Sequence, residues 1–301
     1  MRVHHGLPDE RLPPAALTIG SFDGVHLGHQ AVIRRVVDSG GLTPVLITFE
    51  PHPRCVLDPD HCPKSITTLE EKLRLFEPLG IEHAVVLLFT RDLAAQSAGD
   101  FMGRLLDAVD LRRLVTGHDF ALGHKREGDL DWLRGHAAEH GYEVDSIGPL
   151  AAAGSEVHSS EIRRLVTLGE VEPAAALLGR EFSLVGTVEQ GHQVGRQLGF
   201  PTANVSVTAN KLVPGTGVYA GRARQGERTW AAAIDVGYRP QFGGTDLTIE
   251  AFLLDFEGDL YQQRMEVAFT ARLRDDAKFA STEDLVAQMR RDVEETRRIL
   301  G

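Results

Sequence analysis

SFDGVHLGHQ, residues 21–30, joins an apolar run to an apparent helix and places two histidines, His26 and His29, three residues apart. The run that leads into it, ALTIGSF, is typical of a short buried strand, and HQAVIRRVVDSG is typical of a helix that ends in glycine. A histidine pair at a strand-to-helix turn is compatible with three interpretations: a metal site, an anion site at the helix N-terminus, or a purely structural turn.

Strand-like and helix-like segments alternate through the first half of the chain. The strand-like segments after the first are TPVLITFE, EHAVVLLFT, RRLVTGHDF and YEVDSIGP, and the helix-like ones are TTLEEKLRLFEPLG, SAGDFMGRLLDAV and DWLRGHAAEHG. Apolar, often β-branched strands that alternate with helices indicate a parallel sheet covered on both faces. We therefore predict a doubly wound, Rossmann-like α/β domain that binds its ligands beyond the carboxyl ends of the strands.

The pattern changes near residue 182. The segments FSLVGTVEQG, VYAGRARQ, TWAAAIDVG, TIEAFLLDF and MEVAFTARL read as short strands separated by glycine-containing breaks. Such a series predicts an antiparallel sheet or barrel. The tail STEDLVAQMRRDVEETRRIL predicts a helix that is capped by Ser281 or Thr282. The sequence therefore predicts two domains, residues 1–181 and 182–301.

The composition limits the classes of function. No stretch approaches the roughly 18 consecutive apolar residues of a membrane helix, and the N-terminus lacks the apolar core of a signal peptide. We expect a cytoplasmic protein. A net charge of -11 argues against a nucleic-acid partner, but it allows small phosphorylated ligands that need only a local positive field. The sequence does not indicate an oligomeric state.

The two cysteines, Cys55 and Cys62, lie in PRCVLDPDHCP. In a cytoplasmic protein we expect free thiols at both positions. His52 and His61 make a zinc site conceivable, but the spacing matches none of the compact zinc motifs.

The position of the histidine pair favours phosphate over metal. Free backbone N–H groups and the positive end of the helix dipole attract anions, and Gly24 and Gly28 allow a close backbone approach. No Gly-Lys-Ser/Thr follows, so the usual P-loop is absent.

Several blocks of the first half resemble one enzyme family. FDGVHLGH is similar to the HxGH signature of the nucleotidyltransferase superfamily, and GSFDGVHLGHQ resembles bacterial bifunctional riboflavin kinase/FMN adenylyltransferases. TFEPHP, TGHDFALG and VHSSEIR resemble further blocks of that family. The resemblance implies catalytic roles for His26, His29 and Arg163. It also implies substrate-binding roles for a second group: Phe22, Asp23, Gly24, Gly28, Asp119, Ser159 and Ser160.

The block VHSSEIR departs from the family pattern at two positions. His158 stands where the pattern has serine, and Ser160 stands where it has threonine. Serine keeps the hydroxyl donor of threonine. A histidine is bulkier, so the nucleotide preference stays open at this position, with CTP as one alternative to ATP.

GHQVGRQLGFPTANV, residues 191–205, combines three glycines with a hydroxyl and a carboxamide two residues apart. Glycines suit a loop that closes over phosphates, and oxygen ligands suit Mg²⁺. The stretch resembles the riboflavin kinase module, which implies Mg²⁺ ligation by Thr202 and Asn204. The same resemblance makes Glu250, in IEAFLLDF, the catalytic base and assigns substrate contacts to four loop residues: Gly195, Arg196, Gly199 and Pro201.

The family resemblance implies a bifunctional enzyme that converts riboflavin to FMN and FMN to FAD, with ATP and Mg²⁺. Asp235 stands where the family has asparagine, Gln241 where it has threonine, and Gln262 where it has glycine. These departures leave open an adenylyltransferase with a weakened kinase module. A non-catalytic flavin-binding regulator is the alternative from another class.

Overall fold

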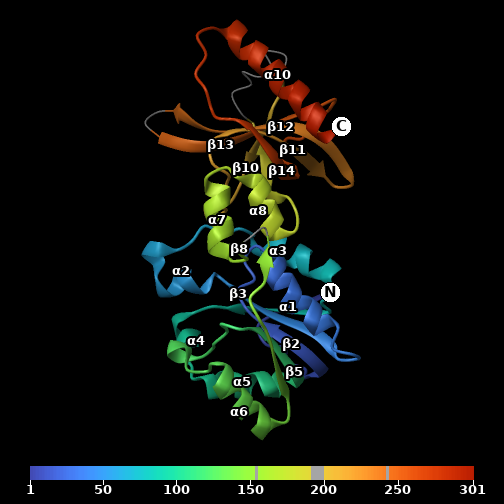
Figure 1. The fold of residues 1–301 in the computed structure, drawn as a ribbon, viewed down its shortest axis with the longest axis vertical. Coiled ribbons are helices and arrows are strands. Elements are labelled where there is room, and N and C mark those ends of the chain that lie inside the picture. Colours follow the sequence, from blue (N-terminus) through green and yellow to red (C-terminus); the bar gives the residue numbers. More distant parts are fainter. Residues whose placement is uncertain (153–154, 191–199, 242–243) are drawn as a thin grey trace. The chain divides into compact units, whose positions relative to one another are not determined.

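The computed structural model describes residues 1–152, 155–190, 200–241 and 244–301 (Figure 1). The chain divides into two compact units, Met1–Ser159 and Ser160–Gly301. The domain boundary between residues 181 and 182 stays a prediction. Within the described residues, no helix combines the length and apolar character that crossing a membrane requires.

The first unit is built on a six-stranded sheet whose paired strands are all parallel. Its strand order is β1-β4-β3-β2-β5-β6. The strands are β1 (Arg2–His5), β2 (Leu12–Ile19), β3 (Thr43–Glu50), β4 (His83–Leu88), β5 (Val109–Gly117) and β6 (Glu143–Ile147). The order reverses between β2 and β5, and ligands of doubly wound folds bind at such a switch point. The predicted α/β domain is confirmed.

Helices cover both faces of this sheet (Figure 1). One core packs α5 and α6 against residues such as Leu17 and Ile47, and the other packs α1 and Phe76 of α3 against the opposite face. The α-helices of the unit are α1 (Leu27–Val37), α2 (Pro53–Leu57), α3 (Leu69–Phe76), α4 (Arg91–Ala95), α5 (Ala98–Ala108) and α6 (Leu130–His140). Short 3₁₀ turns are η1 (Pro59–His61), η2 (Glu77–Leu79) and η3 (His124–Arg126), and β7 (Ala151–Ala152) pairs with β8 (Ser155–Glu156).

The second unit is a closed antiparallel barrel with the order β10-β13-β12-β11-β14-β9. The strands are β9 (Phe182–Glu189), β10 (Ala203–Ser206), β11 (Gly217–Gln225), β12 (Arg228–Gln241), β13 (Gly244–Leu253) and β14 (Arg264–Arg274). The helices are α7 (Ser159–Thr167), α8 (Val171–Leu178) and α10 (Thr282–Leu300). The predicted barrel and C-terminal helix are confirmed. Arg274 forms a forked ion pair with the buried Asp292, which ties α10 to β14.

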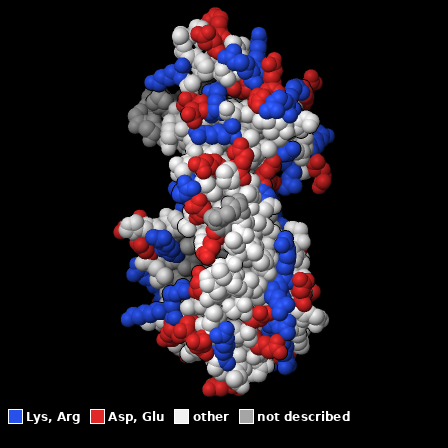
Figure 2. Space-filling model, in the orientation of Figure 1, with Lys and Arg blue, Asp and Glu red and all other residues white. Residues whose placement is uncertain are grey.

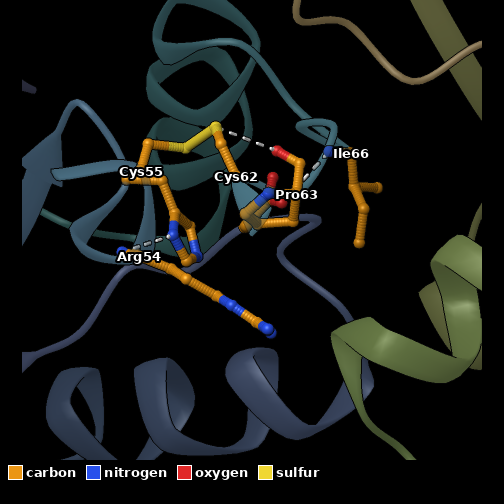
Figure 3. Close-up of a disulfide and its surroundings, with 7 residues drawn as sticks. Arg54, Cys55, Cys62, Pro63 and Ile66 are labelled. Atoms are coloured by element: carbon orange, nitrogen blue, oxygen red, sulfur yellow. Dashed lines mark hydrogen bonds between the residues drawn. A yellow bond between two sulfur atoms is a disulfide. The ribbon is translucent and has the colours of Figure 1, made fainter. Parts of the chain in front are cut away.

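The expectation of free cysteines is wrong, because Cys55 and Cys62 form a disulfide (Figure 3). The short helix α2 and the turn η1 bring the chain back on itself, so the two Cα atoms lie 4.3 Å apart. The expectation rested on the redox state of a presumed compartment, and it took no account of this local turn.

Candidate active sites

His26 and His29 lie together at the start of α1. His26 is the N-cap residue, and its Nδ1 accepts a hydrogen bond from the His29 backbone N–H at 3.3 Å. The two rings stack with their centroids 3.6 Å apart. A Cβ at position 28 would lie 3.2 Å from the His26 ring, so Gly28 leaves space for the imidazole. The helix therefore begins with two stacked imidazoles at its N-terminus.

This helix start lines a cavity of about 310 Å³ in the first unit. The predicted residues that line it together are Phe22, His26, Gly28, His29, Asp119 and Ser159. They come from the loop after β2 and the first turn of α1, from the loop after β5, and from the start of α7. The cavity thus lies at the carboxyl ends of the strands where the sheet order reverses. The binding and catalytic roles of these residues stay predictions.

Asp23 is buried and bonded within the first unit, and its predicted substrate-binding role stays a prediction. Its buried carboxylate accepts hydrogen bonds from the N–H groups of Ile66 and Thr67, at 3.1 and 2.9 Å, and from the Thr67 hydroxyl at 3.1 Å. The Gly24 N–H donates to the same hydroxyl at 2.8 Å. Among the residues that the structure describes, neither Asp23 nor Gly24 lines the cavity. These contacts fix the shape of the loop that carries His26.

Lys72 is a residue that sequence reasoning missed. Its side chain is buried, with an exposed fraction of 4% for the residue, and Nζ lies 3.3 Å from the Ser21 carbonyl oxygen and 3.4 Å from the Thr48 hydroxyl. Burial lowers the pKa of Lys72, and the nearby carboxylates of Glu50 and Asp23 oppose that shift. Lys72 thereby links the segment after β2 to the end of β3.

A signal for Lys72 was present in the sequence. In TTLEEKLRLF, Lys72 falls between Leu69 and Phe76 at the spacing of the apolar stripe of a helix. A lysine on an apolar stripe indicates a buried charge that needs polar partners. The structure supplies those partners at the edge of the cavity.

Thr18 is a second residue that the sequence did not single out. It lies on β2, is 1% exposed and lines the cavity. Within the described chain its hydroxyl has no hydrogen-bond partner. A buried polar group without a partner costs free energy, and a bound substrate would relieve that cost.

The block VHSSEIR spans the border of the two units. His158 lines the cavity, and its Nε2 lies 2.9 Å from the Glu156 carboxylate. Ser160 and Arg163 lie on α7 within the second unit. Their predicted contribution to the histidine site stays a prediction.

In the second unit, Asn204, Glu250 and Asp235 form a row across three neighbouring strands, and Thr202 lies beside it. In the barrel, Glu250 on β13 lies directly opposite Asn204 on β10 and Asp235 on β12. Residues that are directly opposite point to the same face of a sheet. The Thr202 hydroxyl donates a hydrogen bond to the Glu250 carboxylate at 3.1 Å, and Glu250 is 8% exposed. These oxygen donors match the ligands that Mg²⁺ prefers.

A cavity of about 620 Å³ borders this row. It is lined by Pro201, Thr202 and Asn204 on one side and by residues 256–261 on another. Phe256 packs edge-on against Trp230, with the ring centroids 5.2 Å apart. The predicted loop residues Gly195, Arg196 and Gly199 lie outside the described residues, as does the side chain of Gln241.

Two family models match the chain in succession. The FAD synthetase model matches residues 9–161, and the riboflavin kinase model matches residues 178–300. The chain belongs to the family of bifunctional riboflavin kinase/FMN adenylyltransferases. It is an enzyme of FAD biosynthesis with both modules of that family, and a non-catalytic regulator is not favoured.

Curated relatives carry this assignment over nearly the whole chain, and a solved structure shares its fold. The bifunctional riboflavin kinase/FMN adenylyltransferase of Listeria monocytogenes is 36% identical and aligns over 93% of this chain and 91% of its own length. The Escherichia coli enzyme of the same name is 33% identical, with 100% and 97% covered. A Streptococcus pneumoniae crystal structure, titled macrolide-efflux protein, matches with a TM-score of 0.89 at 28% identity and 98% coverage of both chains.

Proposed function

We propose that the first cavity adenylylates FMN and that the second cavity phosphorylates riboflavin. The observation that carries this proposal is that each family module has its own cavity, lined in the first by His26, His29 and Ser159 and in the second by Thr202 and Asn204. The proposed partners are small molecules: ATP, riboflavin and FMN. On the face shown in Figure 2, basic and acidic side chains are interspersed, which suits small ligands better than a nucleic-acid backbone.

In the first reaction, a phosphate oxygen of FMN attacks the α-phosphorus of ATP, and pyrophosphate leaves. No protein nucleophile is needed, so the protein contributes orientation and charge stabilisation. The Nδ1 of His26 accepts a hydrogen bond, so the neutral ring carries its proton on Nε2 and can donate it to a phosphate oxygen. His29 and the N–H groups at the start of α1 add further donors. Arg163 is proposed to neutralise the departing pyrophosphate.

In the second reaction, the 5′-hydroxyl of riboflavin attacks the γ-phosphorus of ATP while Glu250 accepts its proton. The hydrogen bond from Thr202 orients this carboxylate. Thr202 and Asn204 would hold Mg²⁺, which neutralises phosphate charge when bound. Phe256 and Tyr261 line the cavity and offer aromatic faces to the flavin ring.

Product analysis tests both assignments in one experiment. The purified chain is given riboflavin or FMN with ATP and Mg²⁺, and the flavins are separated by chromatography. Riboflavin should yield FMN and then FAD. The His29→Ala variant should accumulate FMN without FAD. Equal FAD formation by wild type and His29→Ala would contradict the assignment of the first site.

A further inference from the structure

The disulfide lies in a segment that is tied to the rest of the first unit at both ends. Residues 51–65 follow β3, whose last residues pair with β4. They lead directly into Ile66 and Thr67, which hold the Asp23 carboxylate. The segment therefore connects the carboxyl end of β3 to the residues that bond to the loop carrying His26.

The segment has little apolar anchoring of its own. None of the residues of α2 or η1, all of which the structure describes, is buried, and the Leu57 side chain is mostly exposed. Several of its backbone hydrogen bonds are local, such as those from Asp58 to Arg54 and from Cys62 to Pro59. A short turn without an apolar core opens at low cost. The Cys55–Cys62 bond is a covalent restraint on its conformation (Figure 3).

The residues next to this turn determine the shape of the histidine loop. Ile66 and Thr67 bond to Asp23, the Thr67 hydroxyl accepts from Gly24, and the Ile66 side chain would lie 3.1 Å from a Cβ at position 24. Residues 51–65 are therefore joined, through Ile66 and Thr67, to the loop between β2 and α1. His26 lies only two residues beyond Gly24.

We propose that Cys55 and Cys62 form a redox modification site that governs the first active site. Both cysteines are partly exposed, so a dithiol can reach the bond. A thiolate of the dithiol attacks one sulfur and forms a mixed disulfide, and its second thiol then resolves that intermediate. The protein gains two electrons and two protons as two cysteine thiols, and the dithiol leaves as a disulfide.

In the oxidised form the disulfide restrains residues 51–65, and Ile66 and Thr67 keep their hydrogen bonds to Asp23. Reduction removes this restraint on residues 51–65. This inference rests on the proposed adenylylation of FMN at the first cavity. We expect reduction to lower kcat/KM for FAD formation by about tenfold, because the loop no longer holds its groups in reactive geometry. Riboflavin phosphorylation should not change, since Asn204 and Glu250 lie on barrel strands and Thr202 directly precedes β10.

The test compares the full chain before and after treatment with dithiothreitol, with the thiol count established by alkylation and mass spectrometry. FAD formation from FMN and FMN formation from riboflavin are measured for both forms. Hydrogen exchange of the Ile66 and Thr67 amides is measured in parallel. Reduction should slow FAD formation and speed exchange at both amides. The Cys55→Ser variant should match the reduced form with or without dithiothreitol.

Two results would overturn the proposal. One is equal FAD formation and equal amide exchange in forms whose thiol counts differ. The other is an equal response to dithiothreitol in the Cys55→Ser/Cys62→Ser double variant. If the oxidised chain makes no FAD at all, the proposed function of the cavity fails instead, and amide exchange then decides whether the bond restrains the segment.

Discussion

In the first unit the proposed catalytic histidines lie at a helix start, whereas in the second unit the proposed base and its neighbours lie on adjacent strands of a barrel. His26 owes its position to a set of buried polar contacts that involve Asp23, Thr67 and Lys72. Glu250 owes its position to the register between β13 and its two neighbours. The two sites handle the same kind of substrate, yet they are held in place by different means.

This difference predicts how each site responds to substitution. A loop that is held by a few polar contacts moves when one contact is lost, because no regular hydrogen-bond ladder replaces it. A residue in a strand keeps its position, since the backbone ladder on both sides persists. The first site should therefore be sensitive to residues outside the cavity, and the second mainly to the residues that contact substrate.

The largest expected effect is that of Glu250→Gln. Loss of the proposed base should lower the rate of riboflavin phosphorylation by about a thousandfold, with FAD formation from FMN unchanged. Steady-state assays of both reactions check this outcome. Glu266→Gln is the matched control on β14, where the exposed pair with Arg224 contributes little. Retention of more than about a tenth of the kinase rate would remove Glu250 from the role of base.

The next largest effect should follow Asp23→Ala, a change that lies outside the cavity. It leaves two backbone N–H groups and the Thr67 hydroxyl without their shared acceptor, so FAD formation should fall by about a hundredfold. Kinase activity should persist. The free energy of unfolding of the first unit should fall by about 2–3 kcal/mol in urea titrations. Asp131→Ala, a change at an exposed residue, serves as the control. Full FAD synthesis by Asp23→Ala would show that the hydrogen bonds to Asp23 do not hold the first site in place.

Lys72→Met should lower FAD formation by about tenfold, because the Ser21 and Phe49 carbonyls lose their shared donor. The same variant tests the lowered pKa of Lys72. The folded state holds fewer protons on this group than the unfolded state between the lowered pKa and 10.5, so the wild type should gain stability as pH rises through that window. Lys72→Met should lack this gain. Equal pH dependence in both proteins would argue against the buried charge.

The strands and helices of the first unit could be predicted from the sequence because the pattern of apolar residues within each segment is typical of its own kind of element. The histidine pair could be placed at a helix start for the same reason. The set of hydrogen bonds to the Asp23 carboxylate could not, since the donors are more than forty residues away and two of the three are backbone N–H groups with no sequence signature. The disulfide depends on the turn made by α2 and η1, which compartment arguments do not address. The row of Asn204, Glu250 and Asp235 depends on strand register, which follows from the barrel as a whole.

The smallest expected effect concerns Asp235, the residue at which the barrel departs from the family. Its carboxylate faces Glu250 across the strand pair, and like charges that are directly opposite repel each other. Asp235→Asn should lower the KM for ATP in the kinase reaction by about threefold, because one negative charge near the phosphates is lost. The sign of the change decides between two interpretations. A lower KM means that Asp235 weakens an active kinase, whereas a higher KM, together with weaker Mg²⁺ binding by calorimetry, means that its carboxylate helps to hold the cation.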